Sequence, residues 1–405
     1  MLTPRQIESL PVQLMDNVEK LEDYLIRDIC GRFRESGASE TALHRIRVLQ
    51  RQGLDLAEIE KRIRRFSGIS QTEIDRIFDR AIEYNNDFAQ EAFTKSSLLP
   101  NQDAYFGLNL ESEAIRRQTL NVFSNLTQSM GFNMYIGGRN QFSTIAETYQ
   151  KMLDIAYTKV ASGGVSYNQA IQEAVKDLTD SGLGVVMWSS GRVDRVDVAV
   201  RRAVMTGINQ VSTKYSDFVA EKLETDLVET TAHQGARDTG DGYENHKRWQ
   251  GKVYSRTGHD KRYPSLELVC GLGQGGGLCG WNCRHSYYAF VDGISVRTYT
   301  DEELRAIDPP PFEYEGKTYT AYEATQIQRK VERTIRQKKR NLIGYHAAGL
   351  DEAYENSAIR LNSLNRKYTE FSEIAGLTLQ RNRAQIQGFG RRESARAVGA
   401  NRRAG

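Results

Sequence analysis

Cysteine, histidine and long apolar runs are scarce in this chain of 405 residues. Four cysteines, three of them clustered, are too few and too unevenly placed for a disulfide scaffold, so we expect reduced thiols. Apolar runs such as LGVVMW are far too short to cross a bilayer. The first residues, MLTPRQIESLPVQLMDN, lack the basic start and apolar stretch of a secretion signal. These absences favour a water-soluble protein made in a cytoplasm.

Charged residues are distributed unevenly along the chain, although the formal net charge is only +3. The last stretch, RNRAQIQGFGRRESARAVGANRRAG, carries seven arginines against one glutamate. Such a composition predicts a flexible tail at residues 381–405 that is attracted to polyanions such as DNA. A solvating tail without any partner remains an alternative. The candidate nucleic-acid-binding residues are Arg381, Arg383, Arg391, Arg392, Arg396, Arg402 and Arg403.

Helical patterns dominate outside one segment, so the predicted fold class is α+β, mainly α. Residues 1–98 are expected to form a bundle of short helices. Ser70 and Glu73 have the spacing of a capping box, and Gly53 and Gly68 are expected to end helices. Residues 99–228 are predicted as a helical middle region. It includes one long helix from Arg192 to Leu223, with an apolar stripe at four-residue spacing.

The character of the sequence changes near residue 227. Residues 229–300 are rich in glycine, aromatic and β-branched residues, with turn signals such as DTGDG and GQGGG, and they predict a small module of short strands and long loops. Residues 301–380 are expected to be helical again, with Thr300 and Glu303 capping the first helix and a short hairpin in DPPPFEYEGKTYTA.

The module holds an unusual concentration of potential metal ligands. Zinc takes three or four N or S ligands, and the candidates here are Cys279, Cys283, His285, His246 and His233, with Cys270 as a further sulfur. No CxxC pair is present, so the spacing fits a zinc site only loosely. One bound zinc ion is therefore a hypothesis. A free cysteine that packs as a small apolar side chain is its simplest rival.

Two catalytic interpretations compete with the metal site. Cys283 with a nearby imidazole resembles a cysteine nucleophile, but no oxyanion-hole pattern accompanies it. GLGQGGG resembles a phosphate-binding loop, but it lacks the Lys-Ser/Thr of a P-loop, and a loop with positive φ is the better interpretation. On the residues alone, a loop-rich structural module held by a polar network is favoured over an active site.

The run HQGARDTGDGYENHKRWQGKVYS, followed by YPS and GLCGWNCRHSYYAFVDGIS, resembles the phage minor capsid protein 2 family of tailed phages and prophages. It is more distantly similar to the Mu F-like head morphogenesis proteins, which have a comparable NCR segment. The resemblance is best over residues 192–340. One departure is Cys270, where a small polar residue is more usual in the family. The motif positions are His233, Gly235, Ala236, Arg237, His246, Trp249, Gln250, Gly251, Lys252, Tyr263, Pro264, Gly280, Asn282, Cys283, Arg284, His285 and Ser286.

The resemblance implies a non-enzymatic minor protein of the phage head, present in the virion at the portal vertex or capsid interior. It would act in head assembly, DNA packaging or ejection, with portal and capsid proteins and packaged double-stranded DNA as partners. The alternative is a head-carried enzyme, a metal-dependent hydrolase or transferase delivered with the DNA. A third hypothesis, an internal scaffold lost on maturation, is disfavoured by the compact module.

Overall fold

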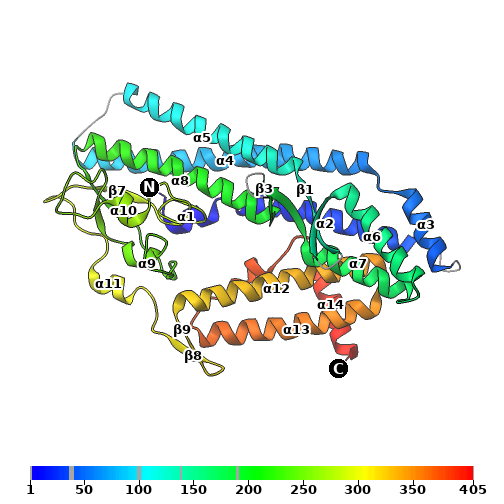
Figure 1. Cartoon of the computed structure of the whole chain (residues 1–405). Coiled ribbons are helices and arrows are strands. Elements are labelled where there is room, and N and C mark those ends of the chain that lie inside the picture. The colour runs from blue at the N-terminus through cyan, green and yellow to red at the C-terminus, as the bar shows by residue number, and fades with distance from the viewer. Residues whose placement is uncertain (1, 36–40, 98–101, 137–138, 188–190, 405) are drawn as a thin grey trace. The chain divides into compact units, whose positions relative to one another are not determined.

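The computed structural model describes residues 2–35, 41–97, 102–136, 139–187 and 191–404. Contacts group the chain into two compact units, each built from three separate stretches. The first unit holds Met1–Leu14, Ser70–Phe123 and Val200–Thr325, and the second holds Met15–Ile69, Ser124–Ala199 and Gln326–Gly405. This grouping differs from the five consecutive regions predicted from the sequence. The mainly helical α+β class is confirmed (Figure 1).

The N-terminal helices are α1 (Pro4–Ser9), α2 (Val12–Glu35), α3 (Ala42–Gln52) and α4 (Leu56–Lys95). As predicted, Gly53 ends α3, with a φ of 61° and its N–H bonded to the carbonyl of Leu49. The predicted stop at Gly68 is wrong, because α4 continues through it as one helix of 40 residues. Ser70 therefore lies inside α4, where it is fully buried and does not cap a helix.

Three long helices form the helical part of the first unit: the second half of α4, most of α5 (Gln102–Gln128) and most of α8 (Val196–Lys222). The predicted apolar stripe of α8 is buried, as Val200, Val204 and Ile208 are fully enclosed. Gly207 sits beside this stripe, and a Cβ there would lie 2.4 Å from Thr119 Oγ1 and 2.7 Å from Phe78 Cζ. Glycine therefore lets α8 approach α4 and α5 closely.

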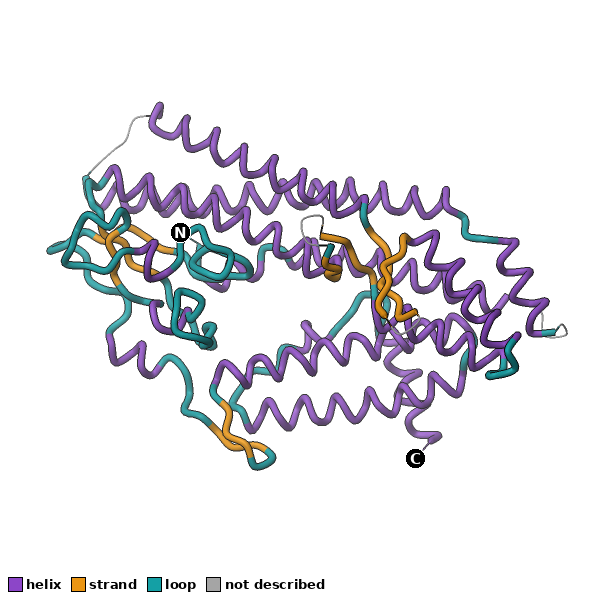
Figure 2. Tube along the Cα trace, in the orientation of Figure 1, coloured by secondary structure: helices purple, strands orange, loops and turns teal. Residues whose placement is uncertain are grey.

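The predicted small module follows α8 in the first unit. Its sheet has the order β6-β5-β7 and is antiparallel, with β5 (Leu227–Thr230) central between β6 (Val253–Ser255) and β7 (Tyr287–Phe290). Two short helices, α9 (His246–Trp249) and α10 (Leu266–Cys270), interrupt long loops (Figure 2). One apolar cluster fills the module: Val228, Trp249, Tyr254, Leu266, Cys270, Leu278, Cys283 and Tyr287.

The segment after the module also agrees with the sequence. Helix α11 (Asp301–Ala306) begins at the predicted capping box of Thr300 and Glu303. The predicted hairpin consists of β8 (Phe312–Tyr314) and β9 (Lys317–Tyr319). The loop-rich module is therefore followed by a short helix and a hairpin before the long C-terminal helices start.

The second unit contains a sheet that the sequence analysis did not predict. It has the antiparallel order β2-β1-β3-β4, formed by β1 (Met130–Ile136), β2 (Arg139–Thr144), β3 (Leu183–Met187) and β4 (Arg192–Arg195). Helices α6 (Ile145–Ala161) and α7 (Tyr167–Ser181) contact β1. The prediction of a helical middle region at residues 99–228 is thus corrected by the presence of this sheet, and the predicted long helix starts at Val196, directly after β4.

The C-terminal part of the second unit is built on α12 (Ala321–Ala348) and α13 (Asp351–Ile374), the two helices predicted there. Gln328 of α12 bonds to Ser372 of α13, and Tyr368 of α13 bonds to Glu332 of α12. The prediction of a flexible tail is corrected. The segment forms a 3-10 turn, η1 (Arg381–Ala384), and then α14 (Arg391–Ala404), which packs against α13. Its apolar residues Ile386, Phe389 and Ala400 are buried and anchor it.

A buried charge network joins several elements of the second unit. The carboxylate of Glu22 on α2 accepts hydrogen bonds from Arg195 Nη2 at 3.0 and 3.2 Å and from the backbone N–H of Leu183 at 2.8 Å. Arg195 also bonds to Asp197 at 3.0 Å. A second guanidinium, that of Arg340 on α12, lies 3.8 Å from Glu22. The network therefore joins α2, β3, β4, α8 and α12.

Candidate functional site

The module brings three of the predicted ligand residues together from different elements. His246 opens α9, while Cys283 and His285 lie in the loop that leads into β7. Helix α8 fixes this loop, because Asn209 Nδ2 donates to the carbonyl of Cys283 at 3.0 Å and Ser216 Oγ donates to that of Tyr287 at 2.7 Å.

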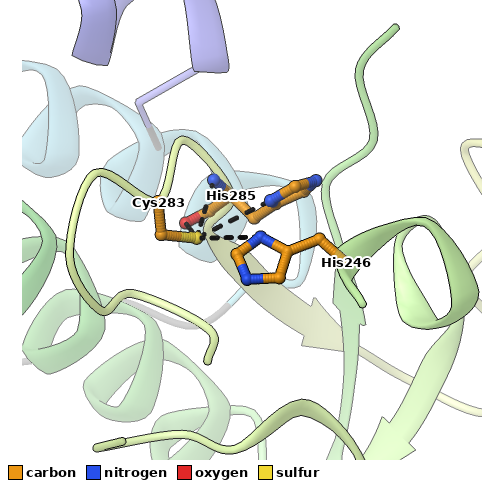
Figure 3. Close-up of side chains that lie close together, drawn as sticks. All are labelled: His246, Cys283 and His285. Atoms are coloured by element: carbon orange, nitrogen blue, oxygen red, sulfur yellow. Dashed lines mark hydrogen bonds between the residues drawn. The ribbon is translucent and has the colours of Figure 1, made fainter. Parts of the chain in front are cut away.

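The cluster is compact and buried (Figure 3). Cys283 Sγ lies 3.9 Å from Nδ1 of His246 and 3.6 Å from Nδ1 of His285. The exposed fractions of His246, Cys283 and His285 are 3%, 2% and 0%. Their three ligand atoms all lie within 4.8 Å of one another, so among the described residues these side chains form a group able to hold a metal ion.

The neighbouring groups determine where the imidazole hydrogens are. His246 Nε2 lies 2.9 Å from the carbonyl oxygen of Gly276, which can only accept, so Nε2 carries the hydrogen. His285 Nε2 lies 3.0 Å from Gln250 Oε1, and that oxygen is identified because it also accepts the backbone N–H of His233. His285 is therefore also protonated at Nε2, and both Nδ1 atoms present a lone pair to Cys283.

Electrostatics keep both rings neutral. Burial, opposed only in part by the bond to Gly276, lowers the pKa of His246 to about 4. Burial also lowers the pKa of His285 well below its usual value, and the positive charges of Arg284 and Arg237 add to this. Burial raises the pKa of the Cys283 thiol. Without a metal ion, the three groups are thus two neutral imidazoles and one thiol, and Cys283 lacks the lowered pKa of a cysteine nucleophile.

The other predicted ligands lie beside the cluster rather than in it. The His233 ring stacks on His285 with centroids 4.3 Å apart, and its Nδ1 lies 2.9 Å from the carbonyl oxygen of Gln234. Cys279 Sγ faces the carbonyl oxygen of His285 at 3.6 Å. Cys270 is fully buried in the module core. The structure thus separates His246, Cys283 and His285 from the wider set of candidates.

Several of the remaining motif residues surround this cluster. Trp249 is 1% exposed, packs its ring against His246 and His285, and donates Nε1–H to the carbonyl of Tyr243. Arg237 donates to Gly276 O at 2.9 Å, so it shares its acceptor with His246. Arg284 pairs with Glu8 at 3.2 Å. The motif therefore encodes the surroundings of the cluster as well as its members.

Other motif residues shape the backbone around the cluster. Gly235 has a φ of 68° and donates its N–H to Asp308. A Cβ at Gly280 would lie 2.4 Å from the carbonyl oxygen of Gln274. The rest hold turns, strand ends and the N-terminal segment. Ala236 is fully buried, and Gly251 and Asn282 have positive φ. The backbones of Lys252, Tyr263 and Pro264 form hydrogen bonds within the module. Ser286 donates a hydrogen bond to the carbonyl of Leu2.

Sequence reasoning missed two contributors to the site. Asn209 is fully buried on α8, and its position one residue after Ile208 in the apolar stripe was the available signal. Gly276 contributes through its backbone carbonyl, for which side-chain chemistry gives no signal. The GLGQGGG segment itself holds two glycines with positive φ, Gly271 and Gly273, as predicted.

The arginines predicted to bind nucleic acid lie in the second unit on η1 and α14. Arg381, Arg391, Arg392, Arg402 and Arg403 are exposed, while Arg383 and Arg396 are half-buried. Arg403 pairs with Glu355 at 3.0 Å. The basic residues are therefore displayed by a folded helix and not by a flexible tail.

The fold and the module define a mainly helical protein with a buried His-Cys-His cluster, and comparison with known proteins identifies its family. The phage minor capsid protein 2 family matches residues 2–373, which is nearly the whole chain, and the chain belongs to this family. It is therefore a structural protein of the phage head. No curated protein and no solved structure shows significant similarity to the chain. Within the described residues, no helix is long and apolar enough to cross a membrane.

Proposed function

We propose that this protein acts at the portal vertex or in the capsid interior, in head assembly, DNA packaging or ejection. The observation that carries the proposal is the family match over residues 2–373. The exposed arginines of α14 support a position near the packaged genome, because guanidinium groups bind phosphates. Portal and capsid proteins are the expected partners.

The copy number in purified particles tests the proposed location. We expect mass spectrometry of peptides, referenced to the major shell protein, to give a fixed and low number of chains per mature virion. Limited protease treatment of intact particles should leave the chain uncut, because an internal protein is shielded by the shell. Absence from particles, or a copy number that varies between preparations, would contradict the proposal.

The DNA contact predicts a specific effect of the arginines. Replacing Arg391, Arg392, Arg402 and Arg403 with glutamine is expected to weaken binding of double-stranded DNA by roughly 10-fold or more at low salt. The plot of the logarithm of the binding constant against the logarithm of the salt concentration should become less steep. Its negative slope should decrease in magnitude by up to about 3.6, since each lost phosphate contact removes about 0.9. Fluorescence anisotropy with a labelled duplex at several salt concentrations measures both quantities.

A matched control removes four charges elsewhere. Arg51, Lys61, Arg64 and Arg65 are exposed residues of α3 and α4, and their replacement by glutamine makes the same change in net charge. We expect this variant to bind DNA nearly as well as the unchanged protein. Equal losses in the two variants would show that binding follows net charge and not α14.

The alternative of a head-carried enzyme receives less support from the site. Each member of the cluster is at most 3% exposed, so a substrate would reach it only after the module opened. The raised pKa of the Cys283 thiol also disfavours nucleophilic attack. We therefore propose a structural role for the cluster.

A further inference from the structure

We propose that His246, Cys283 and His285 bind one zinc ion through Nδ1, Sγ and Nδ1, and that this ion holds the module together. The proposal goes beyond the head location, because it concerns the chemistry of the module wherever the protein acts. It rests on three observations: the distances between the ligand atoms, the count of available hydrogens and the partners of the outer ring nitrogens.

The sulfur–nitrogen distances are close to those of a tetrahedral zinc centre. Zinc bonds of about 2.0–2.1 Å to nitrogen and about 2.3 Å to sulfur place neighbouring N and S ligands about 3.6 Å apart. The two Sγ–Nδ1 distances are 3.6 and 3.9 Å, and the Nδ1–Nδ1 pair lies within 4.8 Å. Two nitrogens bound to one tetrahedral zinc lie about 3.3 Å apart, so the His246 ring would move toward His285 when the ion binds.

The hydrogens of the three side chains do not satisfy every acceptor in the cluster. Both Nδ1 atoms present lone pairs, as the bonds of both Nε2–H groups require. One Cys283 S–H group can satisfy only one of these lone pairs, and Sγ also faces the backbone N–H of His285 at 3.4 Å. In a site with exposed fractions of 3% or less, one imidazole nitrogen would stay without a donor, which is unfavourable. A metal ion satisfies both lone pairs and the thiolate together.

The outer contacts are those that metal-binding residues make. A ligating histidine usually donates its other N–H to a carbonyl or carboxylate, which orients the ring. His246 does this to Gly276 O, and His285 does it to Gln250 Oε1. The backbone N–H of His285 points at Sγ, where it would stabilise a thiolate. The ligand atoms are therefore held in place by the fold before any ion binds.

The ligand set selects zinc among the common metals. Two imidazoles and one thiolate suit a borderline-soft cation, whereas magnesium and calcium prefer oxygen ligands. Zinc would link α9 to the loop before β7. Cys279 Sγ and the stacked His233 ring are not part of the ligand group, so the proposed centre has three protein ligands.

The full chain, purified without a histidine tag or chelators, provides the first test. We expect about one zinc ion per chain by mass spectrometry of the metal content. Replacement by cobalt should give an absorption band from thiolate to Co²⁺ and the intense visible bands of a tetrahedral centre. A chain that takes up neither zinc nor cobalt, and whose melting temperature is unchanged by a chelator, would overturn the proposal. These readouts use the unaltered protein, so they do not depend on how a variant folds.

Variants then assign the ligands. We expect Cys283→Ser to lose the thiolate band and the bound zinc, whereas Cys270→Ser and Cys279→Ser keep both. Cys270 and Cys279 are matched controls, since they are cysteines of the same module outside the ligand group. Loss of metal from Cys279→Ser with a folded far-ultraviolet circular dichroism spectrum would overturn the three-ligand assignment.

Discussion

Replacing Glu22 with alanine is expected to lower the free energy of unfolding of the second unit by about 3–5 kcal/mol. The Glu22 carboxylate is buried and accepts hydrogen bonds from Arg195 and from the backbone of Leu183. Among the described residues, its removal leaves Asp197 as the buried counter-charge of the guanidinium groups of Arg195 and Arg340. Urea unfolding followed by circular dichroism measures the loss, and faster hydrogen exchange of β3 amides would place it in this unit.

The effect of Glu22 is also expected to depend on pH. Burial acts to raise the pKa of Glu22, but Arg195 and Arg340 outweigh it and the pKa lies below its usual value. A lowered carboxyl pKa stabilises the fold above the unfolded-state pKa of about 4.3, and this contribution is lost as the pH falls through the folded-state pKa. The stability difference between the unchanged protein and Glu22→Gln should therefore shrink below pH 4.

Glu60 is the control for this experiment. It pairs with Arg64 on the exposed face of α4, with 65% and 71% of the side chains accessible. Exposed pairs of this kind contribute little, so Glu60→Ala should change stability by no more than about 0.5 kcal/mol. Similar losses in Glu60→Ala and Glu22→Ala would show that burial of the network is not the cause.

Trp249→Ala is the second change with a large expected effect, a loss of about 3–5 kcal/mol in the stability of the module. Trp249 belongs to the apolar cluster of the module and packs its ring against His246 and His285. The deletion would leave a cavity and an acceptor, the carbonyl of Tyr243, without its partner. Chemical unfolding followed by circular dichroism avoids the change in tryptophan fluorescence.

Trp281 provides a matched control in the same module. Its side chain is 61% exposed, so Trp281→Ala removes the same atoms from a site that is already largely in water. We expect a change of about 0.5 kcal/mol or less. Equal destabilisation by the two substitutions would contradict the packing that the structure shows.

Periodicity and capping predicted the helices of the C-terminal part because their signals are local. Thr300 caps α11, and α12 and α13 carry apolar positions at helical spacing. The sheet of the second unit was missed because its strands have four to seven residues and lie between strong helical patterns. Gly53 ends a helix and Gly68 does not, although both glycines follow a helical pattern in the sequence and both were predicted to end helices. The difference is conformational, as Gly53 has a φ of 61° and Gly68 lies within a helix.

The C-terminal segment shows the weakness of composition as a guide. Its arginines suggested a flexible tail, but Ile386, Phe389 and Ala400 give it an apolar face that packs on the fold. The segment has few large apolar residues beside its seven positive charges, which made this face hard to recognise.

The candidate cluster could be predicted as a set of residues but not as a geometry. His246, Cys283 and His285 stood among the candidates together with Cys279 and His233. The structure separates them by side-chain direction: Cys279 has a φ of 59° and turns its sulfur toward a carbonyl, and His233 stacks its ring face on His285. Spacing along the sequence does not determine these directions.

The hydrogen bond from Ser286 to the carbonyl of Leu2 joins residues 284 positions apart. A ribosome working at 5–20 residues per second needs roughly 15–55 s to synthesise that interval. Throughout this time the first segment of the chain has no finished module to pack on. Newly made chains are therefore exposed to proteases and chaperones at their N-terminus until most of the polypeptide has been synthesised, and slow translation would lengthen that exposure.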